Sequence, residues 1–288
     1  MRWCAIVLAG VLSGCGPSPG TAPPPEQTAA RVVSLVPAVT EMLFAIGAGP
    51  DVAGVSSFDR FPAEVAALPK VGALVDPDFE RIITLRPTMV VVYGSQDALI
   101  ARLLNASINV YRYQHAAGGS LDHVSHTMRE LGVRLGRIPS ANAAAAAVEQ
   151  ELSDVRQRVR NLPRPSTALV FGREPGALRG IYVSGGAGFL HELIETAGGR
   201  NAFADVARES VQASAETLLT RRPAVIVELR TADASPDRIE AERAVWSRLA
   251  GVPAVRDGRV IFLTDPAISI PGPRIGHAAR LLAAALHP

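Results

Sequence analysis

Cysteine is scarce in this chain of 288 residues, which contains only Cys4 and Cys15. Because we expect the segment that holds Cys4 to be removed, the chain offers neither a disulfide framework nor a cysteine-based metal cluster. A strong charge is also lacking, since 29 basic residues nearly balance 27 acidic ones and the net charge is +2. So weak a field argues against nucleic acid as a partner.

The apolar run at residues 4–12 is too short to span a bilayer and is typical of a secretory signal. It leads into Leu12-Ser13-Gly14-Cys15, which resembles a bacterial lipobox. We expect residues 1–14 to be a signal peptide and Cys15 to carry a lipid that anchors the protein outside the cytoplasm, in the periplasm or on the cell surface. An ordinary signal peptide with a chance cysteine is the alternative. Residues 15–30 are rich in Pro, Gly and Thr and are predicted to form a disordered tether.

Hydrophobic residues make up 48% of the chain, enough for a sizeable core. From Arg31 onward, short β-branched runs alternate with amphipathic helical stretches, a pattern that indicates parallel sheets built from βα units. The predicted strands are 32–35, 52–56, 89–93, 110–113, 168–171, 225–229 and 260–263. The predicted helices between them include 40–46, 79–85, 98–104, 123–135 and 275–286.

The middle of the chain breaks this alternation. Residues 141–161 form one helical pattern, with Ser140 as the expected N-cap and Pro163 as its stop. Such a helix would be about 30 Å long, the diameter of a small domain. We predict an α/β fold of two Rossmann-like lobes with mainly parallel sheets, residues 31–138 and 166–288, joined by a single long α-helix within 139–165. A surface helix of one larger domain is the alternative.

An internal repeat supports two related lobes. Residues 80–87 read Glu-Arg-Ile-Ile-Thr-Leu-Arg-Pro, and residues 216–223 read Glu-Thr-Leu-Leu-Thr-Arg-Arg-Pro. A capping residue, Asp78 or Ser214, lies two positions before each glutamate. Glu80 and Glu216 could simply stabilise their own helix starts. As a matched pair of exposed anions, they could instead meet paired cations on a two-fold symmetric partner.

Several motifs together resemble the cobalamin and iron-siderophore periplasmic-binding family, over nearly all of the chain after the tether. They are residues 31–41 (RVVSLVPAVTE), 54–62 (GVSSFDRFP), 68–72 (LPKVG), the repeat at Glu80, and 184–203 (SGGAGFLHELIETAGGRNAF). The resemblance implies two α/β lobes bridged by one long helix. It also implies that Glu80 and Glu216 pair with arginines of the two subunits of an ABC permease. Where cobalamin-binding relatives tend to have further aromatic residues, this chain has Leu74 and Ser210.

Ligands of parallel α/β sheets bind beyond the carboxyl ends of the strands. The residues predicted to contact a ligand there are Pro37, Phe58, Tyr93 and Gly94 on the first lobe and Phe171, Gly172, Arg173, Arg230 and Asp265 on the second. The aromatic rings could lie against a flat macrocycle, or could be core. Arginines such as Arg60, Arg173 and Arg230 could attract the carboxylates of haem or the donors of a ferric siderophore.

Two other readings of the chain remain open. His123 and His126 share a helix face and could belong to a zinc or manganese receptor, with His191 and His277 as scattered candidates. The run Ser184-Gly-Gly-Ala-Gly could be a phosphate loop or nucleophile turn of a lipid-anchored enzyme, but it lacks the frame of either motif. Its glycines are better explained by a close approach of the backbone near a helix that begins at Phe189.

The sequence therefore predicts a monomeric substrate-binding lipoprotein of an ABC importer and not an enzyme. It should hold one small-molecule ligand between its lobes and pass it to a membrane permease dimer served by separate ATPase subunits. We expect no cofactor and no metal site of its own, the ligand being a metal chelate such as cobalamin; a ferric siderophore or haem is the alternative.

Overall fold

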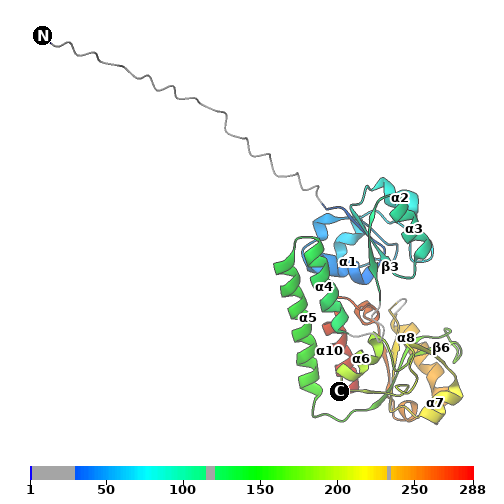
Figure 1. Cartoon of the computed structure of the whole chain (residues 1–288). Coiled ribbons are helices and arrows are strands. Elements are labelled where there is room, and N and C mark those ends of the chain that lie inside the picture. Colours follow the sequence, from blue (N-terminus) through cyan, green and yellow to red (C-terminus); the bar gives the residue numbers. More distant parts are fainter. Residues whose placement is uncertain (2–29, 115–120, 232–234) are drawn as a thin grey trace.

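The computed structural model describes residues 1, 30–114, 121–231 and 235–288. The predicted signal peptide after Met1, Cys15 and the tether up to residue 29 lie outside the described residues. The described chain forms two α/β lobes, with the helix α5 (Ile138–Val159) running alongside both (Figure 1). No helix of the described part is both long and apolar enough to cross a membrane.

The first lobe is built on a parallel sheet of four strands in the order β2-β1-β3-β4. The strands are β1 (Val32–Ser34), β2 (Val52–Val55), β3 (Met89–Tyr93) and β4 (Asn109–Tyr113). The helices of this lobe are α1 (Pro37–Ala45), α2 (Phe79–Thr84), α3 (Asp97–Asn105) and α4 (Asp122–Arg134), with 3-10 turns at Gly49–Asp51 and Ala63–Ala67. All four strands predicted for this half are confirmed to within one residue at either end.

Strand β3 shows why the strands of this sheet have continuous apolar sequences. Val90 and Val92 pack with Ile82 of α2 and with α3 on one face, whereas Val91 packs with α1 and α4 on the other. Both faces are covered by helices, so the first four residues of the strand are buried and no polar alternation remains.

The second lobe contains a mixed sheet in the order β10-β9-β5-β6-β8, with β7 paired to β5. Its strands are β5 (Ser166–Gly172), β6 (Ile181–Ser184), β7 (Arg200–Asn201), β8 (Ser210–Ala213), β9 (Val225–Leu229) and β10 (Val260–Leu263). The helices are α6 (Phe189–Thr196), α7 (Ala215–Arg221), α8 (Pro236–Trp246), α9 (Pro253–Arg256) and α10 (Ile275–Leu286), with 3-10 turns at Ser247–Leu249 and Pro266–Ser269. The β5, β9 and β10 ladders are parallel, whereas β6 and β8 are antiparallel additions that the sequence did not reveal.

Helix α5 turns one side to the protein through a stripe of small and branched apolar residues. Its buried residues are Ala141, Ala145, Val148, Leu152, Val155 and Val159. This stripe packs on α4 at one end and on α10 at the other (Figure 1). The prediction that Ser140 caps the helix is wrong. The helix begins at Ile138 after Arg137, and the Ser140 hydroxyl instead donates to the carbonyl oxygens of Ile46 and Arg137, at 2.7 and 3.1 Å.

Candidate functional site

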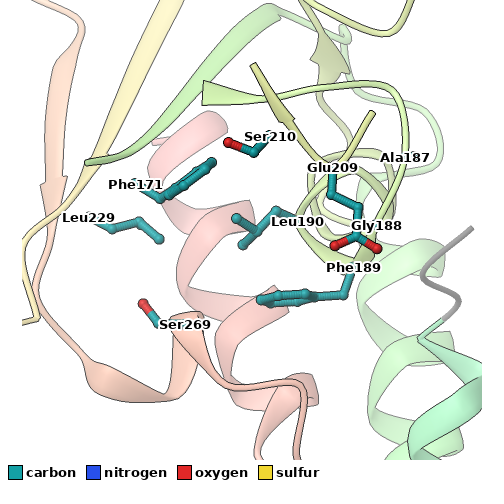
Figure 2. A pocket seen from close by; sticks show the side chains of 9 residues that line it. All are labelled: Phe171, Ala187, Gly188, Phe189, Leu190, Glu209, Ser210, Leu229 and Ser269. Atoms are coloured by element: carbon teal, nitrogen blue, oxygen red, sulfur yellow. The ribbon is translucent and has the colours of Figure 1, made fainter. Parts of the chain in front are cut away.

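A cavity of about 350 Å³ lies at the carboxyl ends of the parallel strands of the second lobe. Phe171 reaches it from β5 and Leu229 from β9, and Ser269 closes it from the 3-10 turn that follows β10. The remaining lining residues are 187–190, Glu209 and Ser210. Figure 2 shows the rings of Phe171 and Phe189 and the side chain of Leu190 around the open space. The wall is therefore largely apolar and aromatic, as in sites for apolar small molecules.

The glycine run before α6 shapes one side of this cavity. A Cβ at Gly185 would lie 2.1 Å from the Arg208 carbonyl oxygen, and one at Gly186 would lie 2.0 Å from that of Ala204. Only glycine permits this approach, which brings the loop onto residues 204–208. Helix α6 begins at Phe189, so the structural explanation of the glycine run is confirmed.

The predicted ligand residues of the first lobe lie just beyond its strands. Pro37 opens α1 after β1, and Phe58 follows β2 with 65% of its surface exposed. Tyr93 ends β3 and is half-buried, with its ring 6.2 Å from that of Tyr113. Gly94 lies against the side chain of Gln114, since a Cβ on Gly94 would be 2.8 Å from Cγ of Gln114.

Arg173 lies in a buried ion-pair network of the second lobe. Its side chain is fully buried, with Nε 3.1 Å from a Glu228 carboxylate oxygen and Nη2 2.7 Å from Glu242 Oε2. Nη1 donates to the carbonyl oxygens of Glu174 and Ala177. Since the donors of its guanidinium are engaged inside the lobe, Arg173 holds the β5–β6 connection in place and presents no group to the cavity.

Arg230 is the more accessible partner of the same network, with 17% of its side chain exposed. It donates from Nε to Glu228 Oε1 at 2.6 Å, and the indole of Trp246 donates to the other oxygen of Glu228 at 2.6 Å. Burial opposes ionisation of Glu242, but the Gly176 N–H together with Arg173 and Arg230 holds the pKa of Glu242 below its usual value. The two arginines are thus matched by two carboxylates, which leaves little positive charge for a ligand.

Asp265 follows β10 and caps the next turn by accepting from the Ala267 N–H at 2.8 Å. This bond and the His277 imidazole, 2.9 Å away, lower the pKa of Asp265. Gly172 ends β5 opposite Tyr182. The predicted second-lobe residues therefore divide: Phe171 lines the cavity, Gly172 and Asp265 lie at the same strand ends, and Arg173 is internal.

The two lobes touch directly through Arg274, which precedes α10. Its guanidinium donates to both oxygens of Glu41 on α1, at 2.9 and 2.5 Å, and lies 4.1 Å from the centre of the Phe61 ring. Even with this partner, burial raises the pKa of Glu41. Sequence reasoning missed this contact because Glu41 and Arg274 are 233 positions apart.

Asp59 is a second buried carboxyl near Glu41, with only 2% of its surface exposed. Neither carboxylate oxygen has a hydrogen-bond partner among the described residues. Burial raises the pKa of Asp59, and the nearby Ser56 and Thr40 hydroxyls and Lys70 offset only part of the rise.

Replacement of Asp59 by asparagine should therefore stabilise the protein at neutral pH. The raised pKa means that the folded state binds this proton more tightly than the unfolded state, so wild-type stability falls as pH rises through that pKa. Thermal unfolding should show a higher midpoint for Asp59→Asn at pH 7, and the difference should disappear below about pH 3, where Asp59 is protonated in both states. The exposed Asp76→Asn is the control. Equal midpoints at pH 7 would contradict the prediction.

The two copies of the repeat share their local geometry. Asp78 and Ser214 accept from the N–H groups of Arg81 and Thr217, at 3.0 and 3.1 Å, so both predicted caps are confirmed. Thr84 and Thr220 each donate to the carbonyl oxygen of the glutamate four positions earlier. Arg86 and Arg222 have φ of 47° and 49°, which ends each helix ahead of its proline.

Glu80 and Glu216 are both exposed in the first turn of these helices. Glu80 is 79% exposed and 3.7 Å from Arg102, and Glu216 is 3.4 Å from the Ser214 hydroxyl. Neither contact buries its carboxylate, so both are accessible to a partner.

The four histidines that raised the question of a metal receptor do not gather at one site. The rings of His123 and His126 stack with their centres 6.4 Å apart. His191 Nδ1 is instead 3.2 Å from the Asn201 amide, and His277 pairs with Asp265. Within residues 30–114, 121–231 and 235–288, no group of three or more His, Cys, Asp or Glu side chains is placed to hold a metal ion.

Comparison with known proteins agrees with this architecture. The vitamin B12-binding protein of Salmonella paratyphi A is 29% identical over 260 residues, 90% of each chain, and that of Pectobacterium carotovorum is 27% identical over 260 residues, 89% of this chain and 88% of the relative. The apo periplasmic haem-binding protein of Roseiflexus sp. RS-1 superposes with a TM-score of 0.76 at 27% identity, covering 90% of this chain and 98% of that one. The periplasmic vitamin B12-binding protein of Vibrio cholerae shares the fold, with a TM-score of 0.75 at 23% identity over 89% and 96% of the two chains.

Two α/β lobes, with an apolar cavity at the carboxyl ends of parallel strands, define a binding protein for a small molecule. The model of the periplasmic binding protein family matches residues 32–267, and the chain belongs to this family. Its members bind substrates for transport and are not enzymes, which confirms the prediction of a receptor over a lipid-anchored enzyme. The predicted fold class is confirmed as well.

Proposed function

We propose that this protein is the lipid-anchored receptor of an ABC importer. It captures a corrinoid such as cobalamin between its lobes and delivers this ligand to a permease dimer. The observation that carries the ligand assignment is the composition of the cavity wall. Phe171, Phe189, Leu190 and Leu229 offer apolar surface, Ser210 and Ser269 offer hydroxyls, and no arginine, lysine or histidine is among the lining residues described.

This wall suits a large neutral macrocycle better than an anionic one. The periphery of a corrinoid carries mainly neutral amides, which need apolar contact and a few hydrogen bonds. Haem propionates and siderophore donors would call for basic side chains, which pair well with carboxylates. The arginines nearest to the strand ends, Arg173 and Arg230, are already paired with Glu228 and Glu242. Relatives named vitamin B12-binding proteins support the same ligand.

Calorimetric titration of the protein without its first 15 residues tests the assignment. We expect tight one-to-one binding of cyanocobalamin and much weaker binding of haem and ferric siderophores. Binding of haem or a ferric siderophore without binding of cyanocobalamin would retain the receptor and overturn the corrinoid. Haem belongs in the series because a haem-binding protein is among the similar structures.

Phe171→Ala should weaken cyanocobalamin binding about tenfold or more. The ring forms one wall of the cavity, and loss of an aromatic contact of this kind corresponds to at least about 1.4 kcal/mol. Phe171→Leu, which keeps most of the apolar volume, should lose less. Leu104→Ala, at an exposed position of α3, serves as the control in the same titration. An unchanged dissociation constant in a folded Phe171→Ala protein would place the ligand elsewhere.

A further inference from the structure

Glu209 is the charged residue among those described around the cavity. It comes just before β8, where its carbonyl oxygen accepts from the Gly185 N–H at 3.1 Å. Its side chain packs across Gly188, since a Cβ on Gly188 would lie 2.9 Å from Glu209 Cγ. Figure 2 shows the carboxylate between Gly188 and Phe189, at the edge of the open space.

The carboxylate of Glu209 is not used by the fold. Within the described part of the chain it makes no hydrogen bond and no ion pair, in contrast to Glu228 and Glu242 in the same lobe. Its side chain is exposed to solvent. A ligand that fills the cavity must come close to this negative charge, whatever else holds it.

We propose that Glu209 selects ligands by charge: it accepts hydrogen bonds from amide N–H groups on the rim of a corrinoid and repels ligands that carry a carboxylate there. This inference rests on the proposed function and deepens it, because it assigns a specificity role to one residue of the site. A hydrogen bond to an ionised acceptor is stronger than one between neutral groups. If a carboxylate of the ligand lies within about 4 Å of the Glu209 carboxylate, the partly screened repulsion is enough to weaken binding about tenfold or more.

A structural role is the competing explanation, because Glu209 lies beside the first turn of α6 and could stabilise that helix by its charge. The two explanations differ in what they predict for Glu209→Gln, which keeps the size of the side chain and removes the charge. A structural role would lower the melting temperature and leave ligand preference unchanged. A specificity role would change the preference among ligands that differ only in charge.

Cobalamin monocarboxylates, in which one peripheral amide is hydrolysed to a carboxylate, are the matched probes. In calorimetric titrations, wild-type protein should bind cyanocobalamin about tenfold or more tightly than at least one monocarboxylate. Glu209→Gln should abolish that difference, and Glu64→Gln, at an exposed position of the first lobe, should preserve it. An equal preference in Glu209→Gln and wild type, or no preference in wild type, would overturn the role of Glu209.

Salt dependence gives a second readout that needs no variant. Raising the ionic strength from about 0.05 to about 1 M should reduce the affinity difference between cyanocobalamin and the monocarboxylate in the wild-type protein. The reason is that the screening length falls to a few ångströms. A salt-independent penalty would contradict a charge effect. If wild-type protein binds no cyanocobalamin at all, the corrinoid assignment itself fails. If it binds cyanocobalamin and the monocarboxylates equally tightly, only the role of Glu209 fails.

Discussion

Simultaneous replacement of Glu80 and Glu216 by alanine is expected to abolish ligand uptake while leaving ligand affinity unchanged. Both carboxylates are exposed at the starts of equivalent helices on the two lobes, and neither lines the cavity. A permease dimer that presents a cation to each lobe would lose both charge pairs at once. Charge pairs of this kind can contribute several kcal/mol to a complex, so loss of two should reduce docking by orders of magnitude.

Cellular uptake of labelled cyanocobalamin and calorimetry on the purified protein measure the two halves of this expectation. The matched control is Glu64→Ala with Glu240→Ala, which removes one exposed glutamate from each lobe outside the repeat. Each single variant, Glu80→Ala or Glu216→Ala, should retain part of the uptake. Normal uptake by the double variant would show that the two glutamates serve only their own helices, where Asp78 and Ser214 already cap the first turn.

Arg173→Met should destabilise the protein by about 3 to 5 kcal/mol, the cost of breaking a buried ion pair by removing one partner. The change keeps an apolar stem in the same space but leaves Glu228 and Glu242, which are nearly fully buried, with Arg230 as their remaining cation. It also removes the guanidinium that lies 5.3 Å from the centre of the Trp246 ring. Denaturant unfolding followed by tryptophan fluorescence measures the loss.

The control for this change is Arg179→Met in the same hairpin. Arg179 pairs with Glu174 at 2.9 Å, but the side chain of Arg179 is 78% exposed. Exposed pairs contribute about 0 to 1 kcal/mol, so this variant should unfold close to the wild-type midpoint. Comparable losses of unfolding free energy in the two variants would mean that the buried network adds no more stability than a surface ion pair.

The positions of the predicted site residues follow from how parallel strands arrange side chains. Phe171, Gly172 and Asp265 lie at the strand ends, as predicted, because the carboxyl ends of parallel strands share one edge of a sheet. Of the three, only Phe171 is among the cavity-lining residues described. Arg173 follows the same strand, yet its side chain turns into the lobe because Glu228 and Glu242 lie there. No local pattern distinguishes these two outcomes for adjacent residues.

Other cavity residues were missed for a related reason. Glu209 and Leu190 belong to segments that only the pairing of β6 with β8 and the close approach of the glycine loop bring beside Phe171. The run Ser184-Gly-Gly-Ala-Gly was the available signal. It predicted a close backbone approach but not which residues it would bring together.

The sequence by itself determined many, but not all, of the helices and strands of this protein. Period-two and period-3.6 patterns, helix caps and prolines are local, so the strands of the first lobe, α10 and the two matched helices of the repeat could be placed from them. Tertiary structure alone decided the antiparallel edge of the second sheet, the Arg274–Glu41 contact between the lobes, and which polar groups are internal and which border the cavity. These depend on residues far apart in the chain, and whether a buried charge is tolerated depends on the partner that folding places beside it.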